Sequence, residues 1–134
     1  MASSRIGENM EDRYLFKAKD CSSIWRAGLL IALQEGRCAI EEKDGSKWAC
    51  NSKTICQCTG LKDKNGKLIW ENDIVRDEHG NFYKAIWQNN HYQFTWSCVK
   101  SDVFFIGAKW DLWSFEISGI EVVGNIFDNP ELLD

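Results

Sequence analysis

Long hydrophobic runs are absent from this sequence of 134 residues. The longest apolar stretch, residues 24–33, spans only ten residues and contains Arg26, so it is too short to cross a bilayer. Residues 1–10 also lack the apolar segment that a secretory signal peptide requires. We therefore expect a cytoplasmic protein that does not bind membranes.

An excess of positive charge is also missing, because 16 Lys and Arg residues face 20 Asp and Glu residues and the net charge is −4. A protein that binds nucleic acid through its phosphates normally presents a basic face. The balance therefore disfavours nucleic acid as a partner, although it leaves a local basic stripe open as an alternative. Five residues could form such a stripe: Arg13, Arg26, Lys62, Lys64 and Lys67.

No catalytic signature is found, neither a G-x-S-x-G elbow, nor a P-loop, nor a G-x-G-x-x-G turn. Acidic residues do cluster around His79, but clustered polar residues at a strand end are usually a solvated rim rather than a catalytic pocket. No cysteine is paired with a histidine in a way that the sequence can show. We expect a protein that is not an enzyme and needs no cofactor. The acidic cluster consists of Glu71, Asp73, Asp77 and Glu78.

Paired metal-ligand spacings are missing as well. Structural zinc sites usually show two cysteines separated by two to four residues, whereas Cys56 and Cys58 have only one residue between them. Residues 63–66 fail as part of a calcium loop, because Leu61 and Asn72 stand where acidic ligands are needed. We expect no metal site. In a reducing cytoplasm the six cysteines should be free and mostly buried thiols: Cys21, Cys38, Cys50, Cys56, Cys58 and Cys98.

Tryptophan, in contrast, is abundant, with seven residues in a short chain. Each ring can bury roughly 150–250 Å², so most of these rings are expected in the core. Short apolar segments separated by Gly and Asn turns are typical of a small β-barrel or sandwich. Asn65-Gly66 indicates a type I′ turn, and Asn129 and Pro130 indicate the N-cap and first residue of a short terminal helical turn. The expected strands cover residues 13–19, 25–33, 38–40, 74–75, 82–88, 91–96, 99–106, 110–117 and 120–127.

The hairpin around Asn89-Asn90 can be predicted down to its register. A two-residue turn there pairs Trp87 with Tyr92 and gathers six largely apolar residues on one face, whereas a three-residue turn places a lysine among apolar partners. Because a slip of one residue exchanges the two faces, we expect the two-residue register and a buried aromatic face. That face consists of Tyr83, Ala85, Trp87, Tyr92, Phe94 and Trp96.

Two segments carry a family resemblance. Residues 54–75 read TICQCTGLKDKNGKLIWENDIV, and residues 121–133 read EVVGNIFDNPELL. Both resemble the conserved segments of the YopX family of phage and prophage proteins, with Cys58 in place of an aromatic residue and Asn72 in place of a glycine. The resemblance implies an SH3-like β-barrel and no known reaction. We therefore expect a mainly β fold, an SH3-like small barrel with additional N-terminal strands and a short C-terminal helical turn.

These observations combine into one prediction. Residues 1–9 form a flexible leader, and residues 10–134 form a single domain. The protein is a phage or prophage accessory protein in the host cytoplasm that binds a host or phage protein, and it also self-associates, since short strands leave sheet edges to be covered. A nucleic-acid-binding barrel is the alternative function. The candidate partner-binding residues are Trp110, Trp113, Lys62 and Lys64.

Overall fold

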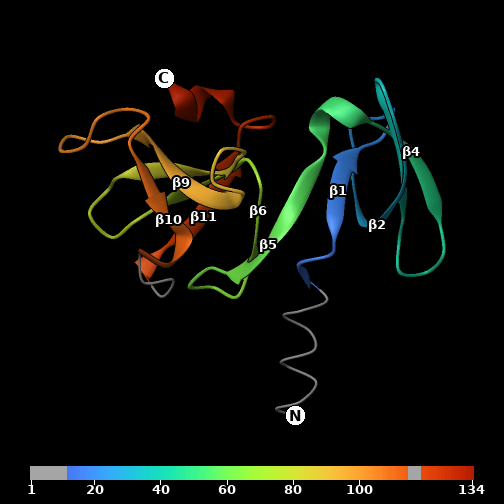
Figure 1. The fold of residues 1–134 in the computed structure, drawn as a ribbon, viewed down its shortest axis with the longest axis horizontal. Helices are drawn as coiled ribbons and strands as arrows, with labels where there is room; N and C mark the ends of the chain where they lie inside the picture. The colour runs from blue at the N-terminus through green and yellow to red at the C-terminus, as the bar shows by residue number, and fades with distance from the viewer. Residues whose placement is uncertain (1–11, 115–118) are drawn as a thin grey trace, which may run out of the picture. The chain divides into compact units, whose positions relative to one another are not determined.

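The computed structural model describes residues 12–114 and 119–134, and the chain divides into two compact units, Met1–Gly60 and Leu61–Asp134 (Figure 1). Neighbouring strands are antiparallel, so the expected mainly β fold is confirmed. The strand pairings among the described residues form no closed barrel. The single domain over residues 10–134 stays a prediction, and the leader at 1–9 lies outside the described residues.

The first unit is a curled antiparallel sheet with the order β4-β3-β2-β1-β5. An isolated bridge between Asp20 and Cys50 brings the end of β1 back to β4. Inside the curl lie Ala18, Cys38, Ile40 and Cys50, each at most 4% exposed. Its elements are β1 (Phe16–Lys19), β2 (Trp25–Gln34), β3 (Arg37–Glu41), β4 (Lys47–Asn51), the 3-10 helix η1 (Ser52–Thr54) and the start of β5 (Cys56–Lys62).

Gly28 explains how a glycine comes to lie within the longest strand. A Cβ atom at this position would collide with the backbone carbonyl oxygen of Glu41 on β3. The register between these two strands also shifts, between Leu30 and Ala32. A glycine inside a strand often marks such a close approach or a bulge, so Gly28 permits the curl of this sheet.

The second unit contains a five-stranded sheet with the order β10-β9-β8-β7-β11, while β6 pairs with β5. Its core consists of Ile69, Val75, Tyr83, Ala85, Trp96, Cys98 and Ile120, with Leu61, Ala108, Trp110, Leu112 and Val122 packed around them. Its elements are β6 (Leu68–Trp70), β7 (Asp73–Arg76), β8 (Phe82–Gln88), β9 (Gln93–Lys100), β10 (Lys109–Asp111), β11 (Glu121–Asn125) and the 3-10 helices η2 (Leu112–Ser114) and η4 (Pro130–Leu133).

The predicted register of the β8–β9 hairpin is wrong by two residues. Trp87 pairs with Phe94 and Ala85 with Trp96, so residues 89–92 form a four-residue loop in place of the expected two-residue turn. A shift by two residues keeps every side chain on its predicted face, and Tyr83, Ala85 and Trp96 are therefore buried as expected. Trp87 and Tyr92 are not: the longer loop leaves them 42% and 81% exposed.

Three further local predictions need correction. The strand expected at 99–106 ends at Lys100, and residues 101–107 form a loop. At the Asn65-Gly66 turn only Gly66 has a positive φ, of 79°, whereas a type I′ turn requires it at both residues. Asn129 occupies the N-cap position without a side-chain cap bond, because its Oδ1 accepts from the backbone N–H of Asn125 instead. The strand expected at 110–117 lies partly outside the described residues.

Asp63 ties the β5–β6 hairpin to β11. Its carboxylate accepts backbone N–H groups from Asn65 and Lys67 at 2.9 Å and from Val122 at 2.8 Å. Burial alone would raise the pKa of Asp63, but these three amides hold it below the ordinary value. The ionised carboxylate therefore stabilises the folded state.

We predict that Asp63→Asn lowers the free energy of unfolding at pH 7 by about 1.5–3 kcal/mol, the range for hydrogen bonds to a charged group. Because the folded-state pKa is lowered, this stabilisation is complete above the ordinary value of 3.8 and disappears as the pH falls through the folded-state value. Urea unfolding at pH 7 and pH 3 measures both effects. The exposed Asp102→Asn is the matched control, and equal losses in the two variants would contradict this role.

The cysteines are all free, and only Cys21 is exposed. Burial raises the pKa of Cys38 and Cys98, and it raises the pKa of Cys50 to about 11. Because the thiolate is the reactive form, we predict that one thiol of the native protein reacts rapidly with iodoacetamide at pH 7.5. Mass spectrometry should locate the label at Cys21, and Cys21→Ser should abolish the rapid phase. Rapid labelling of several cysteines in the folded protein would contradict the packing described here.

Candidate partner-binding surface

Polar residues of the segment at 54–75 mainly hold the backbone in place. Asp73 is buried and accepts the backbone N–H of Trp70 at 2.8 Å. Asn72 has a φ of 72°, a left-handed conformation that asparagine tolerates better than most residues. Its N–H donates to the Ala85 carbonyl, and its own carbonyl accepts from Ile126. These side chains and backbone groups build the scaffold of the second unit.

The acidic cluster near His79 is organised around a turn. Asp77 accepts the Tyr83 hydroxyl at 2.9 Å and both the backbone and side-chain nitrogens of Asn81. Burial opposes ionisation of Asp77, but the donated hydrogen bonds keep its pKa below the ordinary value. Burial and the adjacent carboxylate together raise the pKa of Tyr83. Asp77 thus fixes the turn between β7 and β8.

The predicted site residues lie on different elements. Trp110 is half-buried on β10, where its ring makes edge contacts with Tyr83 at 5.6 Å and Phe104 at 4.9 Å. Trp113 follows on η2 and is 82% exposed. Lys62 and Lys64 are exposed at the β5–β6 hairpin. Trp110 is therefore part of the packing, while Trp113 and the two lysines remain available to a partner.

The proposed basic stripe is not supported at Arg26. The side chain of Arg26 stacks on the Trp48 ring at 3.4 Å and forms an ion pair with Asp20 at 2.9 Å. Trp48 in turn donates its indole N–H to Glu42. Arg26 therefore stabilises the first unit and is engaged by a carboxylate.

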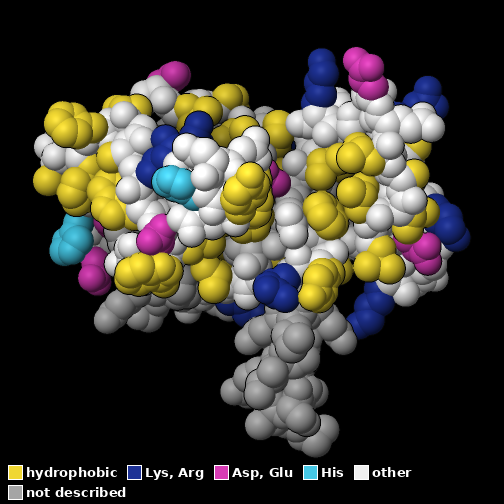
Figure 2. Space-filling model, viewed as in Figure 1, with side chains coloured by type: hydrophobic (Ala, Val, Ile, Leu, Met, Phe, Trp, Pro, Cys, Tyr) yellow, Lys and Arg dark blue, Asp and Glu magenta, His cyan; other side chains and the backbone are white. Residues whose placement is uncertain are grey.

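A surface that the sequence did not indicate lies between β9 and β10. Four consecutive large apolar residues occupy the loop at residues 101–107, which we name the apolar loop. Figure 2 shows hydrophobic side chains at the left edge of the second unit, where Figure 1 places this loop. Their exposed fractions are 78% for Val103, 39% for Phe104, 87% for Phe105 and 69% for Ile106.

Hydrogen bonds and one ring contact brace the apolar loop despite its exposure. The Ser101 hydroxyl donates to Asn81 Oδ1 at 2.6 Å and accepts the backbone N–H groups of Val103 and Phe104. Gly107, with a φ of 87°, donates to the Cys98 carbonyl at 2.7 Å. Phe104 folds back onto the Trp110 ring, so the neighbouring apolar residues are presented on a braced support.

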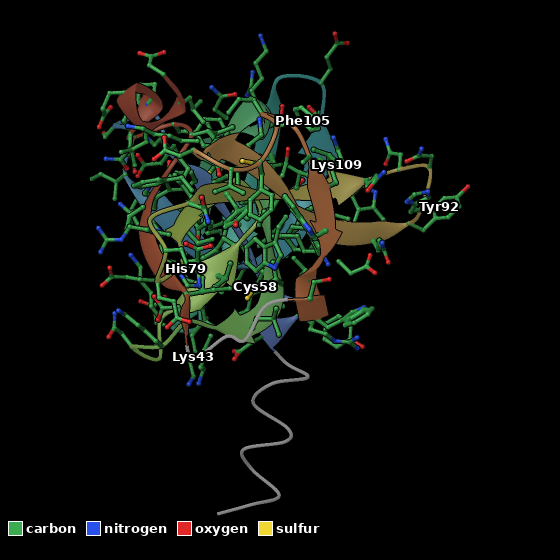
Figure 3. All side chains as sticks on the ribbon, turned by 90° about the vertical axis from the view of Figure 1, so that its left-hand side faces the viewer. Lys43, Cys58, His79, Tyr92, Phe105 and Lys109 are labelled. Atoms are coloured by element: carbon green, nitrogen blue, oxygen red, sulfur yellow. The ribbon has the colours of Figure 1, made fainter. Side chains whose placement is uncertain are left out.

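A second exposed aromatic group lies at the β8–β9 hairpin. Trp87 makes an edge contact with Phe94 at 5.2 Å, and Figure 3 shows Tyr92 projecting at the end of the hairpin, away from Phe105. Tyr92 has a φ of 52°, which is uncommon for a residue other than glycine. The second unit therefore exposes aromatic side chains at two separate loops.

Within the described ranges, no three His, Cys, Asp or Glu side chains are grouped in a way that could hold a metal ion. Helices in that part of the chain are too short or too polar to cross a membrane. The fold and its exposed loops thus define a small two-unit β protein with a braced apolar surface.

The comparisons with known proteins place this fold in a family. Residues 9–134 match the family described as YopX protein, and the chain belongs to this family. A solved structure, protein EF1440 from Enterococcus faecalis, has 22% sequence identity and a TM-score of 0.53, over 89% of this chain and 96% of that one. This likeness concerns the fold. A comparison with curated protein sequences finds no significant match.

We predict that Ser101→Ala loosens the apolar loop, because two backbone amides and one side-chain amide oxygen lose their partner. The free energy of unfolding should fall by about 1 kcal/mol, and amide hydrogen exchange at Val103 and Phe104 should accelerate. Exchange at core amides such as Trp96 should change only in proportion to global stability. Unchanged protection of both loop amides would show that the serine does not brace the loop.

Proposed function

We propose that this chain is a non-enzymatic phage or prophage accessory protein of the host cytoplasm that binds a host or phage protein. The observation that carries the proposal is the apolar loop. Large exposed apolar patches on soluble proteins mark interaction sites, and rigidity reduces the entropy lost on binding. Phe105, Val103 and Ile106 would enter an apolar cleft of the partner, with Trp113 as a further contact.

We also propose that the second unit is related to an SH3-like barrel. Its support is the pairing of β7 with β11 at one edge of the sheet, together with the 3-10 helix η2 between β10 and β11. We also propose that the protein self-associates. The strands β4, β6, β10 and β11 lie at the ends of the two strand orders, and exposed strand edges are commonly covered. Light scattering on a sizing column measures the mass.

Nucleic acid remains the alternative partner. Lys100 and Lys109 are exposed next to the apolar loop, and exposed aromatic residues can stack on bases. A protein partner is favoured because aliphatic Val103 and Ile106 offer no stacking surface and the chain carries net negative charge. Retention of nucleic acid at moderate salt would favour the alternative.

The test is capture of partners from host cells that express a tagged full-length chain. We expect a host or phage protein at near-stoichiometric yield. Replacing Val103, Phe105 and Ile106 together by serine should weaken its affinity at least about 100-fold, since each buried apolar anchor can contribute more than 1 kcal/mol. Affinity is then measured with the purified partner by calorimetry.

Two control variants make the test specific. Tyr92→Ser removes an equally exposed aromatic residue from a different loop and should leave the affinity within about twofold. Lys62→Ser with Lys64→Ser tests the predicted lysines. Full binding by the triple serine variant, or loss only in the lysine variant, would overturn the role of the apolar loop.

A further inference from the structure

A small open pocket lies beside β8, β9 and β10. It has a volume of about 300 Å³. The residues that line it are Gln88, Gln93, Thr95, Lys109, Asp111 and Ser114, together with His91 and the aromatic Trp110. All of these residues belong to the second unit, so the pocket is complete within one compact part of the chain.

One residue that lines the pocket, Thr95, has a buried hydroxyl group without a hydrogen-bond partner among the described residues. The residue is 2% exposed. A buried hydroxyl without a partner is costly, and such groups in native proteins are usually satisfied by water or a ligand. Thr95 is the single described residue with this defect, and it lines the pocket.

Asp111 lies directly opposite Thr95 in the pairing of β10 with β9. Its Oδ1 accepts the Gln93 side-chain N–H at 2.7 Å, which fixes the carboxylate and leaves the Gln93 carbonyl oxygen as an acceptor. Residues opposite each other on antiparallel strands have their side chains on the same face. Thr95, Gln93 and Asp111 therefore border the same pocket.

The chemistry of these groups selects a class of ligand. Hydroxyl and amide side chains both donate and accept, and the Asp111 carboxylate accepts, so the pocket suits a molecule that carries several neighbouring hydroxyl groups. The carboxylate disfavours anions, whereas the Lys109 ammonium disfavours cations. A neutral sugar ring satisfies these conditions, because each of its hydroxyls can donate to one side chain and accept from another.

We infer that this pocket binds a neutral monosaccharide ring, with the Thr95 hydroxyl and the Asp111 carboxylate as its principal contacts. The site is separate from the apolar loop and does not depend on the function proposed for that loop. Binding gives the Thr95 hydroxyl the partner that it lacks in the protein alone.

The test is a titration of the isotope-labelled full-length protein, followed by amide chemical shifts, with glucose, galactose, mannose, N-acetylglucosamine and ribose at up to 50 mM. We expect at least one sugar to give saturable shifts at the amides of Gln93, Thr95 and Asp111. Thr95→Val keeps the shape of the side chain and removes the hydroxyl, so it should weaken binding about tenfold without lowering the melting temperature. Asp111→Asn should also weaken binding, while Asp102→Asn should not.

Two outcomes would overturn the inference. One is the absence of a saturable response to every sugar. The other is equal sugar affinity in the wild type, Thr95→Val and Asp111→Asn. Sodium phosphate serves as the anionic probe. Phosphate could shift the same amides more strongly than any sugar does, and Asp111→Asn could enhance that shift. This result would assign the pocket to anions and thereby reject the sugar.

Discussion

The carboxylate of Asp63 receives three backbone amides, two from its own hairpin and one from β11, which lies almost sixty residues further along the chain. Bringing β11 to this point costs loop-closure entropy, and charge-assisted hydrogen bonds are among the contacts strong enough to offset it. Once β11 is held there, it can pair with β7 and complete the sheet order of the second unit. The other strands of that sheet then rest on a closed core that includes Ile120.

The same logic extends to the other polar residues of the two family-like segments. Asp73 caps the turn after β6, and Asn125 and Asn129 bind each other across the turn that follows β11. A Cβ atom at Gly124 would collide with the Asn129 side chain, which accounts for the glycine beside that turn. Polar groups that are committed to backbone atoms in this way are not available to a ligand. Binding in the second unit must therefore use other residues, on loops and on the outer face of the sheet.

The sequence predicted well where its pattern was local, and poorly where the outcome depended on loop geometry. Strand β2 and the mainly β class followed from apolar segments bounded by turns, and the faces of β8 and β9 followed from alternation with a period of two. The predicted partner of Trp87 was wrong because side-chain patterning cannot distinguish registers that differ by two residues. The prediction of a strand through the apolar loop was wrong for a related reason. The residues VFFI have the composition of a buried strand, and nothing in the local sequence shows that Ser101 and Gly107 turn them outward. The sequence could not single out Thr95 as a site residue, since a hydroxyl without a hydrogen-bond partner is a property of three-dimensional packing.

Strand β10 connects the two candidate surfaces, although it is only three residues long. Successive side chains on a strand point to opposite faces, so Lys109 and Asp111 share one face of β10, while the Trp110 ring packs against Tyr83 in the core. All three residues border the pocket. Trp110 supports Phe104, and through it the apolar loop, while Asp111 faces Thr95 across the ladder. A change in the position of β10 would therefore alter both surfaces together. Among the described residues, β10 pairs only with β9 and lies at the edge of its sheet. A ligand in the pocket would therefore stabilise the strand that supports the apolar loop.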